Sequence, residues 1–452
     1  MTAPPPQSTT TLELEIRPEV LGIDMLRGSV AETIASRIAE AGNGFRETVA
    51  ALIDIHKADN DDKRELREKY AGMTIRAEPT DRGLTLRCCG VPTESLLAGD
   101  LPERQKRQIS QAVRDLILDP TRPEAQSESA AVSGYVRSFV ARTPLLQQAP
   151  RPRCFVWGGH AVGRAEYDFA KEVGYWDALL NGTEHITGCG PGVMKAPFKG
   201  AVVAYGKQDY DKRGIHRDYV GFSERGIIAA EAPNGLVSEL VIFPDVEKRM
   251  EAFIRAAHRG RIHPGGAGTA EELLTMLGVL SHPANADIAY PLDLVERPDG
   301  DYMRHLTDWL RTCFGDALDH LFSVHQDSAR AYAEHVHGTN AELDWTELWN
   351  DRLYFPPEMQ QPFQVTFASM EGLDLSRDQS PFQLLVNLRR FFSALVYLAV
   401  KFPDEAEAWG GELPRIHGDP DILRATDDLI RWFDAAGRMQ LHGEYRRPYR
   451  IA

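Results

Sequence analysis

The chain has 452 residues, of which 26% are charged and 43% are hydrophobic. These proportions are typical of soluble globular proteins and exclude an intrinsically disordered chain. The length is enough for about three domains of roughly 150 residues each. Because 66 acidic residues outnumber 51 basic ones and give a net charge of -15, we expect no general nucleic-acid binding.

Apolar stretches are too short for a membrane-spanning segment: the longest covers residues 391–400, whereas a spanning helix needs about 20 residues. Residues 1–11 lack the basic and apolar regions of a secretion signal and are predicted to form a disordered leader. The cysteines and histidines show no zinc-site spacing. We therefore expect a cytoplasmic protein with no membrane association, no metal site and no cofactor.

The first part of the chain is predicted to be mainly helical. Apolar residues recur at helical spacing in residues 30–55, 101–118 and 130–140, and alternation within residues 73–88 is compatible with a hairpin. Prolines near residues 144–152 then interrupt the pattern. We expect a mainly helical N-terminal domain over residues 1–145, including the disordered leader.

The central part alternates short apolar runs with helical patterns. The runs cover residues 154–157, 219–222, 227–230, 240–243 and 288–295, and the helices are expected at 164–174, 193–205, 245–258 and 270–280. This alternation predicts an α/β fold with a Rossmann-like parallel sheet over residues 146–335, whose ligands bind at the carboxyl ends of the strands.

A charged strand precedes the last glycine-rich loop of this domain. Residues 259–263 read RGRIH, whereas a buried parallel strand is usually apolar throughout. We expect a short and partly exposed strand; the alternative is that Arg261 and His263 face a polar site.

The last part, residues 336–452, is predicted to be a helical C-terminal domain. A long amphipathic pattern begins with Ser380 as a helix N-cap and Pro381 as the first helical residue. A second pattern covers residues 419–438.

Three glycine-rich elements follow predicted strands: Gly158-Gly159, GCGPG at 188–192 and PGGAGT at 264–269. A glycine turn before a helix lets backbone N–H groups approach a phosphate. One such element is explained by turn chemistry alone, but three in one domain predict a phosphate or nucleotide site. Neither a Walker loop nor a good dinucleotide fingerprint is present. The candidate binding residues are Gly158, Gly159, Gly190, Gly192, Met194, Gly265, Gly266, Gly268 and Thr269.

Two charged residues near the third glycine element have both a structural and a functional interpretation. Thr269 and Glu272 have capping-box spacing, and Asp245 is placed to pair with Arg249 on the preceding helix. A carboxylate one helical turn from a bound phosphate is also placed to reach a ribose. The residues alone leave both interpretations open.

The segments DVEKRM at 245–250 and PGGAGTAEE at 264–272 resemble the signature of the LOG family, nucleotide phosphoribohydrolases long misnamed lysine decarboxylases. That signature is an arginine followed by PGGxGTxxE. Residues 187–197, 229–234 and 245–255 are similar to the long three-domain bacterial branch, the pyrimidine/purine nucleotide 5'-monophosphate nucleosidases.

The resemblance implies hydrolysis of the N-glycosidic bond of nucleoside 5'-monophosphates, AMP among them, to a free base and ribose 5-phosphate. Glu272 would stabilise the oxocarbenium-like state and position water, Arg249 would orient Glu272 or the substrate, and Glu271 is the substitute carboxylate. The resemblance also implies a homo-oligomer, a dimer or tetramer, and control by a guanosine alarmone. Two alternatives stay open: a non-catalytic nucleotide or cofactor carrier, and a cytokinin-nucleotide phosphoribohydrolase.

Overall fold

The computed structural model describes residues 8–21, 29–55, 63–80, 83–117, 123–124, 127–209, 217–228, 232–341, 343–401, 409, 412–439, 441 and 445–451. The chain divides into two compact units. The first comprises Met1–Gln148, Gly188–Pro191 and Asp218–Arg249, and the second comprises Ala149–Thr187, Gly192–Arg217 and Met250–Ala452. Within the described ranges, no helix is long and apolar enough to span a membrane.

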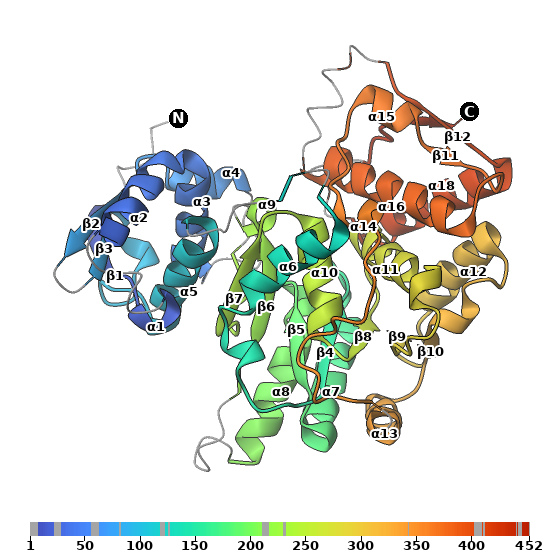
Figure 1. The fold of residues 1–452 in the computed structure, drawn as a ribbon, viewed down its shortest axis with the longest axis horizontal. Helices are drawn as coiled ribbons and strands as arrows, with labels where there is room; N and C mark the ends of the chain where they lie inside the picture. The colour runs from blue at the N-terminus through green and yellow to red at the C-terminus, as the bar shows by residue number, and fades with distance from the viewer. Residues whose placement is uncertain are drawn as a thin grey trace. The chain divides into compact units, whose positions relative to one another are not determined.

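A seven-stranded sheet with the order β10-β9-β8-β4-β5-β6-β7 confirms the predicted Rossmann-like α/β fold (Figure 1). The strand pairs β4–β5, β4–β8, β8–β9, β9–β10 and β6–β7 are parallel. The strands are β4 (Arg153–Trp157), β5 (Glu184–Thr187), β6 (Val220–Glu224), β7 (Glu239–Phe243), β8 (Arg259–Ile262), β9 (Leu292–Val295) and β10 (Ser323–His325).

The strand order reverses between β4 and β8. Successive strands from β4 to β7 are added on one side of β4, whereas β8 returns to its other side and β9 and β10 follow outward. The connections diverge at such a point, and the carboxyl ends of the two strands leave a crevice in which α/β proteins bind ligands. The first and third glycine elements both begin there, because they directly follow β4 and β8.

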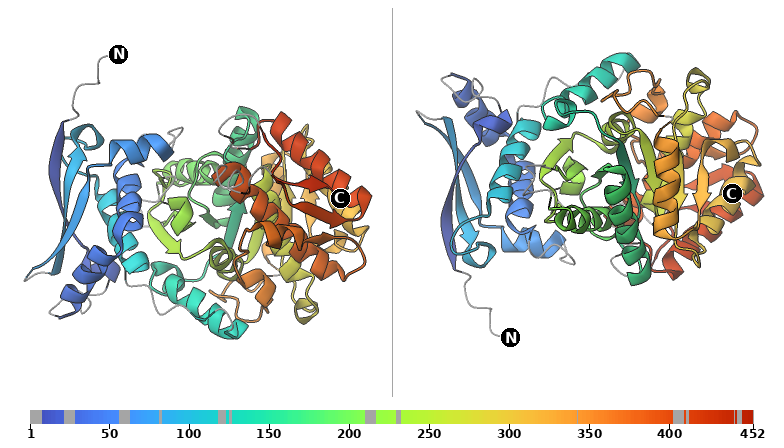
Figure 2. Two further views of the ribbon diagram at one scale, coloured as in Figure 1. Left: turned by 90° about the horizontal axis from the view of Figure 1, so that it is seen from above. Right: turned by 90° about the horizontal axis from the view of Figure 1, so that it is seen from below.

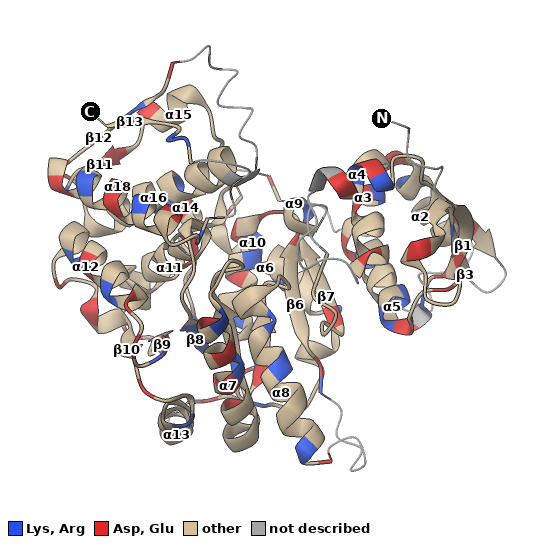
Figure 3. Ribbon diagram, turned by 180° about the vertical axis from the view of Figure 1, so that it is seen from behind, with Lys and Arg blue, Asp and Glu red and all other residues tan. Residues whose placement is uncertain are grey.

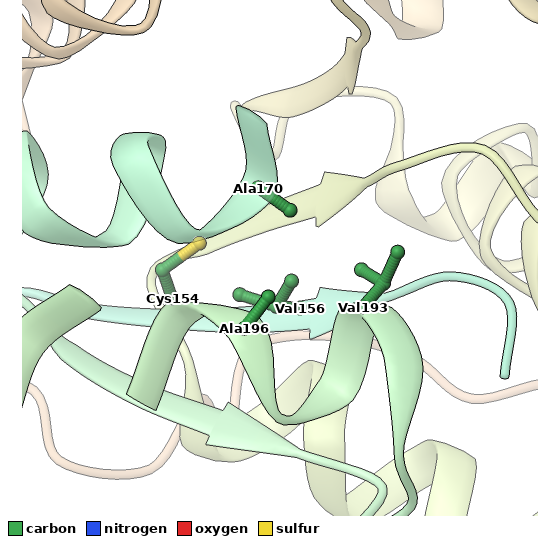
Figure 4. Close-up of a cluster of buried hydrophobic side chains, with 5 residues drawn as sticks. All are labelled: Cys154, Val156, Ala170, Val193 and Ala196. Carbon is green, nitrogen blue, oxygen red and sulfur yellow. The ribbon is translucent and has the colours of Figure 1, made fainter. Parts of the chain in front are cut away.

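The helices of the second unit's α/β part are α7 (Arg164–Asn181), α8 (Ala196–Lys207), α11 (Ala267–Leu280), α12 (Tyr302–Phe314) and α13 (Ala329–Asn340), and α10 (Val246–Ala256) precedes β8. Small buried side chains let α7 and α8 lie close to β4. Figure 4 shows Cys154 and Val156 of β4 together with Ala170 of α7 and Ala196 of α8, and Val193 packs at one side of this cluster. A Cβ at Gly174 of α7 would lie 2.9 Å from the carbonyl carbon of Pro197, so this approach requires glycine.

Strand β8 is fully buried, so the expectation of a partly exposed strand is wrong. The Arg261 guanidinium is paired inside the second unit: it donates to Asp177 Oδ2 at 2.6 Å and to the Tyr332 hydroxyl at 3.0 Å, whereas its buried Nη1 has no hydrogen-bond partner. Asp177 Oδ2 also lies 3.1 Å from His185 Nε2. A charged residue is accepted in this strand because α7 supplies the Asp177 carboxylate and α13 supplies the Tyr332 hydroxyl as partners for its guanidinium.

The first unit contains an antiparallel sheet of order β1-β3-β2, drawn in blue in Figure 2. Its strands are β1 (Thr9–Glu15), β2 (Thr74–Thr80) and β3 (Gly83–Pro92), and its helices are α1 (Pro18–Leu21), α2 (Ser29–Glu40), α3 (Gly42–Ile53), α4 (Lys63–Lys69), α5 (Glu103–Ala112), α6 (Ser129–Val140) and α9 (Arg225–Ile228).

The structure corrects two sequence expectations in this unit. Residues 9–11 were expected in a disordered leader but pair with β3, beginning with Thr9 opposite Pro92; residues 1–7 lie outside the described residues. The apolar run 227–230 was expected as a strand, but residues 227–228 belong to α9 and residues 229–230 are not described. A short apolar run does not distinguish a strand from a buried helical turn.

The edge of β7 is closed by side chains from the helical region. Gln111 Oε1 accepts the Leu240 N–H at 3.1 Å, and Asp115 Oδ2 accepts the Ile242 N–H at 2.9 Å. Arg114 joins this cluster by donating to Glu239 Oε1 at 2.9 Å. Strand N–H groups that would otherwise be open to another chain are therefore satisfied within the first unit.

The end of the chain contains α14 (Pro357–Gln360), α15 (Phe367–Glu371), α16 (Pro381–Leu395) and α18 (Pro420–Ala435). The predicted N-cap is confirmed, since Ser380 Oγ accepts the Gln383 N–H at 3.1 Å. A small sheet of order β11-β12-β13 was not predicted; its strands are β11 (Asp374–Leu375), β12 (Arg415–Gly418) and β13 (Arg450–Ile451). Figure 3 shows charged residues of both signs along α18, as expected for an amphipathic helix with one exposed face.

Candidate active site

Backbone hydrogen bonds of Gly159 join the loop after β4 to the loop after β8 and to the short helix Gly192–Met194 in the second unit. The Gly159 N–H donates to the Pro264 carbonyl at 3.0 Å, and the Val193 N–H donates to the Gly159 carbonyl at 3.1 Å. The loops that follow β4 and β8 and the short helix Gly192–Met194 therefore form one backbone cluster at the carboxyl ends of β4 and β8. This is the crevice that the reversal of strand order predicts for a ligand.

Glycine is required in this cluster by close packing. Gly192 has φ +61, and a Cβ there would overlap the carbonyl oxygens of Gly159 and His160. A Cβ at Gly265 would lie 2.6 Å from Thr269 Cβ and 2.8 Å from the Gly159 nitrogen. Gly268 differs, because nothing lies within 4 Å of the position that its Cβ would take. The loop thus packs tightly at its base and is open at Gly268.

Helix α11 begins three residues earlier than the sequence motif suggested. Gly266 is its N-cap, with φ -126 and ψ -151, and its carbonyl accepts the Ala270 N–H at 3.1 Å. Thr269 is therefore inside the first turn, and the capping-box interpretation of Thr269 and Glu272 is wrong. No side chain caps this end of the helix. Its first N–H groups, together with the helix dipole, favour an anion.

The two candidate carboxylates lie on neighbouring positions of α11. Glu271 is buried, with 8% of its surface exposed, and Glu272 is half-buried in the second turn of the helix. The Glu272 charge acts on Tyr302, the first residue of α12. Burial raises the pKa of the Tyr302 hydroxyl; Arg438 and the Gly265 backbone oppose that rise, whereas the charges of Glu166 and Glu272 add to it. Glu272 is thus near a group of polar residues around the glycine loop.

Three residues at this loop were not predicted: Glu166, Tyr302 and Arg438. Arg438 donates two hydrogen bonds to the Glu166 carboxylate, at 2.6 and 3.2 Å, and its guanidinium lies 5.0 Å from the Tyr302 ring centroid. A Cβ at Gly266 would overlap the Arg438 carbonyl oxygen. No local motif could have indicated these residues, because tertiary packing alone brings them to the loop.

The remaining predicted residues are divided between the two units. Met194 is buried in the second unit, in the short helix Gly192–Met194. Gly190 and Arg249 belong to the first unit. Asn234 Nδ2 donates to the Gly190 carbonyl at 3.2 Å, which fixes that turn, and Arg249 is a buried residue of α10 with 6% exposure. The functional pairing of Arg249 with Glu272 stays a prediction.

The Asp245 carboxylate has a structural role at the start of α10. Its Oδ1 accepts the Lys248 N–H at 3.0 Å, and its Oδ2 lies 3.4 Å from Lys248 Nζ. Across the residues that the structure describes, no group of three His, Cys, Asp or Glu side chains is arranged to hold a metal ion.

Two family profiles match the chain. Residues 334–452 match the profile described as "Pyrimidine/purine nucleotide monophosphate nucleosidase, C-terminal", and residues 194–332 match the profile described as "Possible lysine decarboxylase". Among solved structures, the molybdenum cofactor carrier protein of Chlamydomonas reinhardtii aligns with a TM-score of 0.28 and 15% identity, covering 42% of this chain and 99% of that chain. A similarity this weak supports no conclusion about the fold or function of this chain.

Curated relatives match almost the whole chain. The proteins named pyrimidine/purine nucleotide 5'-monophosphate nucleosidase in Escherichia coli K12 and in Escherichia coli O157:H7 are each 34% identical over 448 residues, which cover 95% of this chain and 95% of the relative. This agreement confirms the resemblance that the glycine and arginine motifs predicted. The chain belongs to the pyrimidine/purine nucleotide 5'-monophosphate nucleosidase family.

Proposed function

We propose that this chain hydrolyses the N-glycosidic bond of nucleoside 5'-monophosphates, releasing the free base and ribose 5-phosphate. The observation that carries the proposal is the glycine cluster at the β4–β8 reversal, with an uncapped N-terminus of α11, in a chain of this family. Such a cluster suits a terminal phosphate held end-on by backbone N–H groups.

The phosphate would bind at the first turn of α11. Gly265, Gly266, Gly268 and Thr269 supply the backbone there, and Gly158, Gly159, Gly190, Gly192 and Met194 complete the proposed substrate site. Gly268 supports this placement, because the space in front of its Cα is open. A ligand anchored at this turn would have its ribose about one helical turn away, near the second turn of α11.

Glu272 is the proposed catalytic carboxylate. Breaking the bond leaves positive charge on the ribose ring, which a carboxylate stabilises, and the same group accepts a proton from the attacking water. The water oxygen bonds to C1', the electron pair of the broken bond leaves with the base, and a proton ends on the base nitrogen. With the capping box excluded, Glu272 has no helix-capping role that would explain it.

Arg249 is proposed to orient Glu272 or the substrate and to stabilise negative charge on the departing base. Glu271 is the substitute for Glu272, although its side chain is the more buried of the two. No metal and no cofactor enters the proposed reaction.

The test is to incubate the purified full chain with AMP, GMP, IMP, CMP and UMP, with and without a chelator, and to quantify released base and ribose 5-phosphate by chromatography. The matching nucleosides are the control for the phosphate requirement. We expect release from one or more monophosphates and none from nucleosides. Nucleotide binding without release from any of them would contradict the proposal and favour the carrier alternative.

Further properties implied by the family belong to the same proposal. These are a cytoplasmic location, a homo-oligomer of two or four subunits, an effector of the guanosine alarmone class, and domain boundaries near residues 145 and 335. Sedimentation equilibrium measures the subunit number. Titration calorimetry with a guanosine alarmone tests the effector, and absence of binding would remove it.

A further inference from the structure

The segment after α18 places Arg438 beside the glycine loop that follows β8. Helix α18 ends at Ala435 and is followed by Gly437, which has φ +65, and the Arg438 N–H donates back to the Phe433 carbonyl at 2.8 Å. This is the hydrogen bond of a Schellman helix end, and it holds the Arg438 backbone in place. The Arg438 carbonyl then lies against Gly266, the N-cap of α11. Figure 1 labels α11, which follows Gly266, and α18, which precedes Gly437 and Arg438.

The Arg438 side chain is buried but its hydrogen-bonding capacity is not used up. Only 10% of it is exposed, and its guanidinium lies beside two neighbouring rings, 5.0 Å from the centroid of Tyr302 and 5.3 Å from that of Trp432. Two N–H groups bind Glu166, but the buried Nε–H has no hydrogen-bond partner. A guanidinium carries five N–H donors, so an unused edge remains.

A second unsatisfied donor lies beside it. The Tyr302 hydroxyl is buried and makes no hydrogen bond of good geometry, and the backbone of Gly265 is the polar group of the loop that faces it. Leaving a buried donor without a partner is costly in free energy, so two such groups at one loop are expected where a ligand supplies the acceptors. Both groups donate, and one is a cation, so the missing partner is an anion with several acceptor oxygens.

We propose that Arg438 and Tyr302 are phosphate-binding residues that donate to the 5'-phosphate held by the glycine loop, with Glu166 as the residue that positions Arg438. The inference rests on the proposed function for the identity of the substrate. It assigns a role to the segment after α18. The glycine loop of the α/β fold supplies backbone N–H groups to the phosphate, and this segment supplies the Arg438 side chain.

The charges agree with this assignment. A phosphate monoester carries close to two negative charges, and the Glu166 carboxylate would repel it if it were alone. Arg438 lies between them, binding Glu166 through one edge of its guanidinium and offering the other edge to the phosphate. Charge-assisted hydrogen bonds of this kind are stronger than neutral ones, and Arg suits planar recognition of a phosphate.

The experiment compares four variants of the full chain: Arg438→Gln, Arg438→Lys, Glu166→Gln and Arg431→Gln. Arg431 is the matched control, since it is an arginine of α18 whose side chain is 65% exposed and pairs with Asp427. Binding of ribose 5-phosphate and of ribose is measured by titration calorimetry, and melting is followed for each variant. KM and kcat are measured on the nucleoside monophosphate that the wild type cleaves best.

We expect Arg438→Gln to weaken ribose 5-phosphate binding roughly 10- to 100-fold, the usual range for losing a hydrogen bond to a charged group, and to raise KM more than it lowers kcat. Glu166→Gln breaks the same ion pair but keeps the cation, so its affinity should stay within roughly fivefold of the wild type. Arg431→Gln should bind as the wild type does. If Arg438→Lys recovers part of the affinity, the effect belongs to the cation.

Two results would overturn the inference: unchanged ribose 5-phosphate binding in Arg438→Gln, or equal loss of binding in Arg438→Gln and Glu166→Gln, which would make the ion pair purely structural. Ribose 5-phosphate binding does not depend on turnover. A wild type that binds ribose 5-phosphate through Arg438 but cleaves no monophosphate would therefore refute the proposed function and leave the phosphate subsite standing.

Discussion

Two glycines of the same loop should respond in opposite ways to alanine. In Gly265→Ala the new methyl carbon would lie 2.6 Å from Thr269 Cβ and 2.8 Å from the Gly159 nitrogen, whereas ordinary contacts begin at 3.4 Å. The first clash involves an atom fixed to a helix and the second a backbone atom, so neither is relieved by rotating a side chain. Overpacking of this kind costs about 1–3 kcal/mol, because the turn after β4 or the start of α11 must move.

Gly268→Ala meets no atom within 4 Å. Gly268 lies in the first turn of α11, where alanine is the better helix former, so the free energy of unfolding should be unchanged or higher by up to about 1 kcal/mol. Its methyl would, however, project into the space in front of the helix where we place the phosphate. Steric exclusion should raise KM for a nucleoside monophosphate roughly tenfold or more.

Thermal or denaturant unfolding measures the stability of both variants, and steady-state kinetics measures KM. Each kcal/mol corresponds to a melting shift of roughly 2–4 °C in a domain of this size, so the expected difference is measurable. The reasoning fails if Gly268→Ala is destabilised as much as Gly265→Ala. It fails equally if Gly268→Ala keeps the wild-type KM, because the open space would then not be the phosphate site.

Three further outcomes are expected. Glu272→Gln should lower kcat by at least about 10²-fold in a base-release assay with little change in stability, and a larger loss in Glu271→Gln would reassign the catalytic carboxylate. Burial lowers the pKa of His263 to about 3 and that of His258 to about 4, whereas an unfolded histidine titrates near 6.5. As the pH falls, the unfolded chain therefore binds these protons before the folded chain does, so this contribution to the free energy of unfolding is fully present above about pH 6.5 and is lost toward pH 4. Denaturant unfolding at pH 7, 5.5 and 4.5 measures the loss. A free energy of unfolding that does not change over this range would contradict the expectation. Ser380→Ala should cost about 1 kcal/mol in the same assay through loss of the N-cap of α16, and no loss would show that the Ser380 hydrogen bond is not stabilising.

The sequence predicted those features whose causes are local. The N-cap Ser380 and the glycine elements are set by backbone requirements within a few residues, and the α/β alternation is set by periodicity in each segment. The family motif is also local, since PGGAGT and its flanking residues are contiguous. These predictions therefore needed no knowledge of which elements meet in space.

Local patterns misled where a tertiary partner changed the outcome. The charged residues of β8 suggested a partly exposed strand because a buried parallel strand is usually apolar, but Asp177 and Tyr332, distant in sequence, pair with the buried Arg261. Thr9 falls in the leader that was expected because residues 1–11 lack the basic and apolar regions of a secretion signal, but it pairs with β3. In the motif at α11, Thr269 and Glu272 have the spacing of a capping box, but the extended Gly266 begins the helix earlier.

The failure to predict Arg438 has the same physical origin and bears on the chemistry. A glycine loop can supply N–H groups from contiguous residues, but it cannot supply a cation without a side chain that would occupy the ligand's space. Such a charge must come from a side chain of another element that packs against the loop. The segment after α18 does so, because the Arg438 carbonyl packs against Gly266. A cation of this kind has no sequence signature near the loop, and its presence is indicated by buried donors that lack an acceptor. On this argument, removing the positive charge of Arg438 should weaken phosphate binding without altering the backbone of the loop, whereas substitutions within the loop should disturb both.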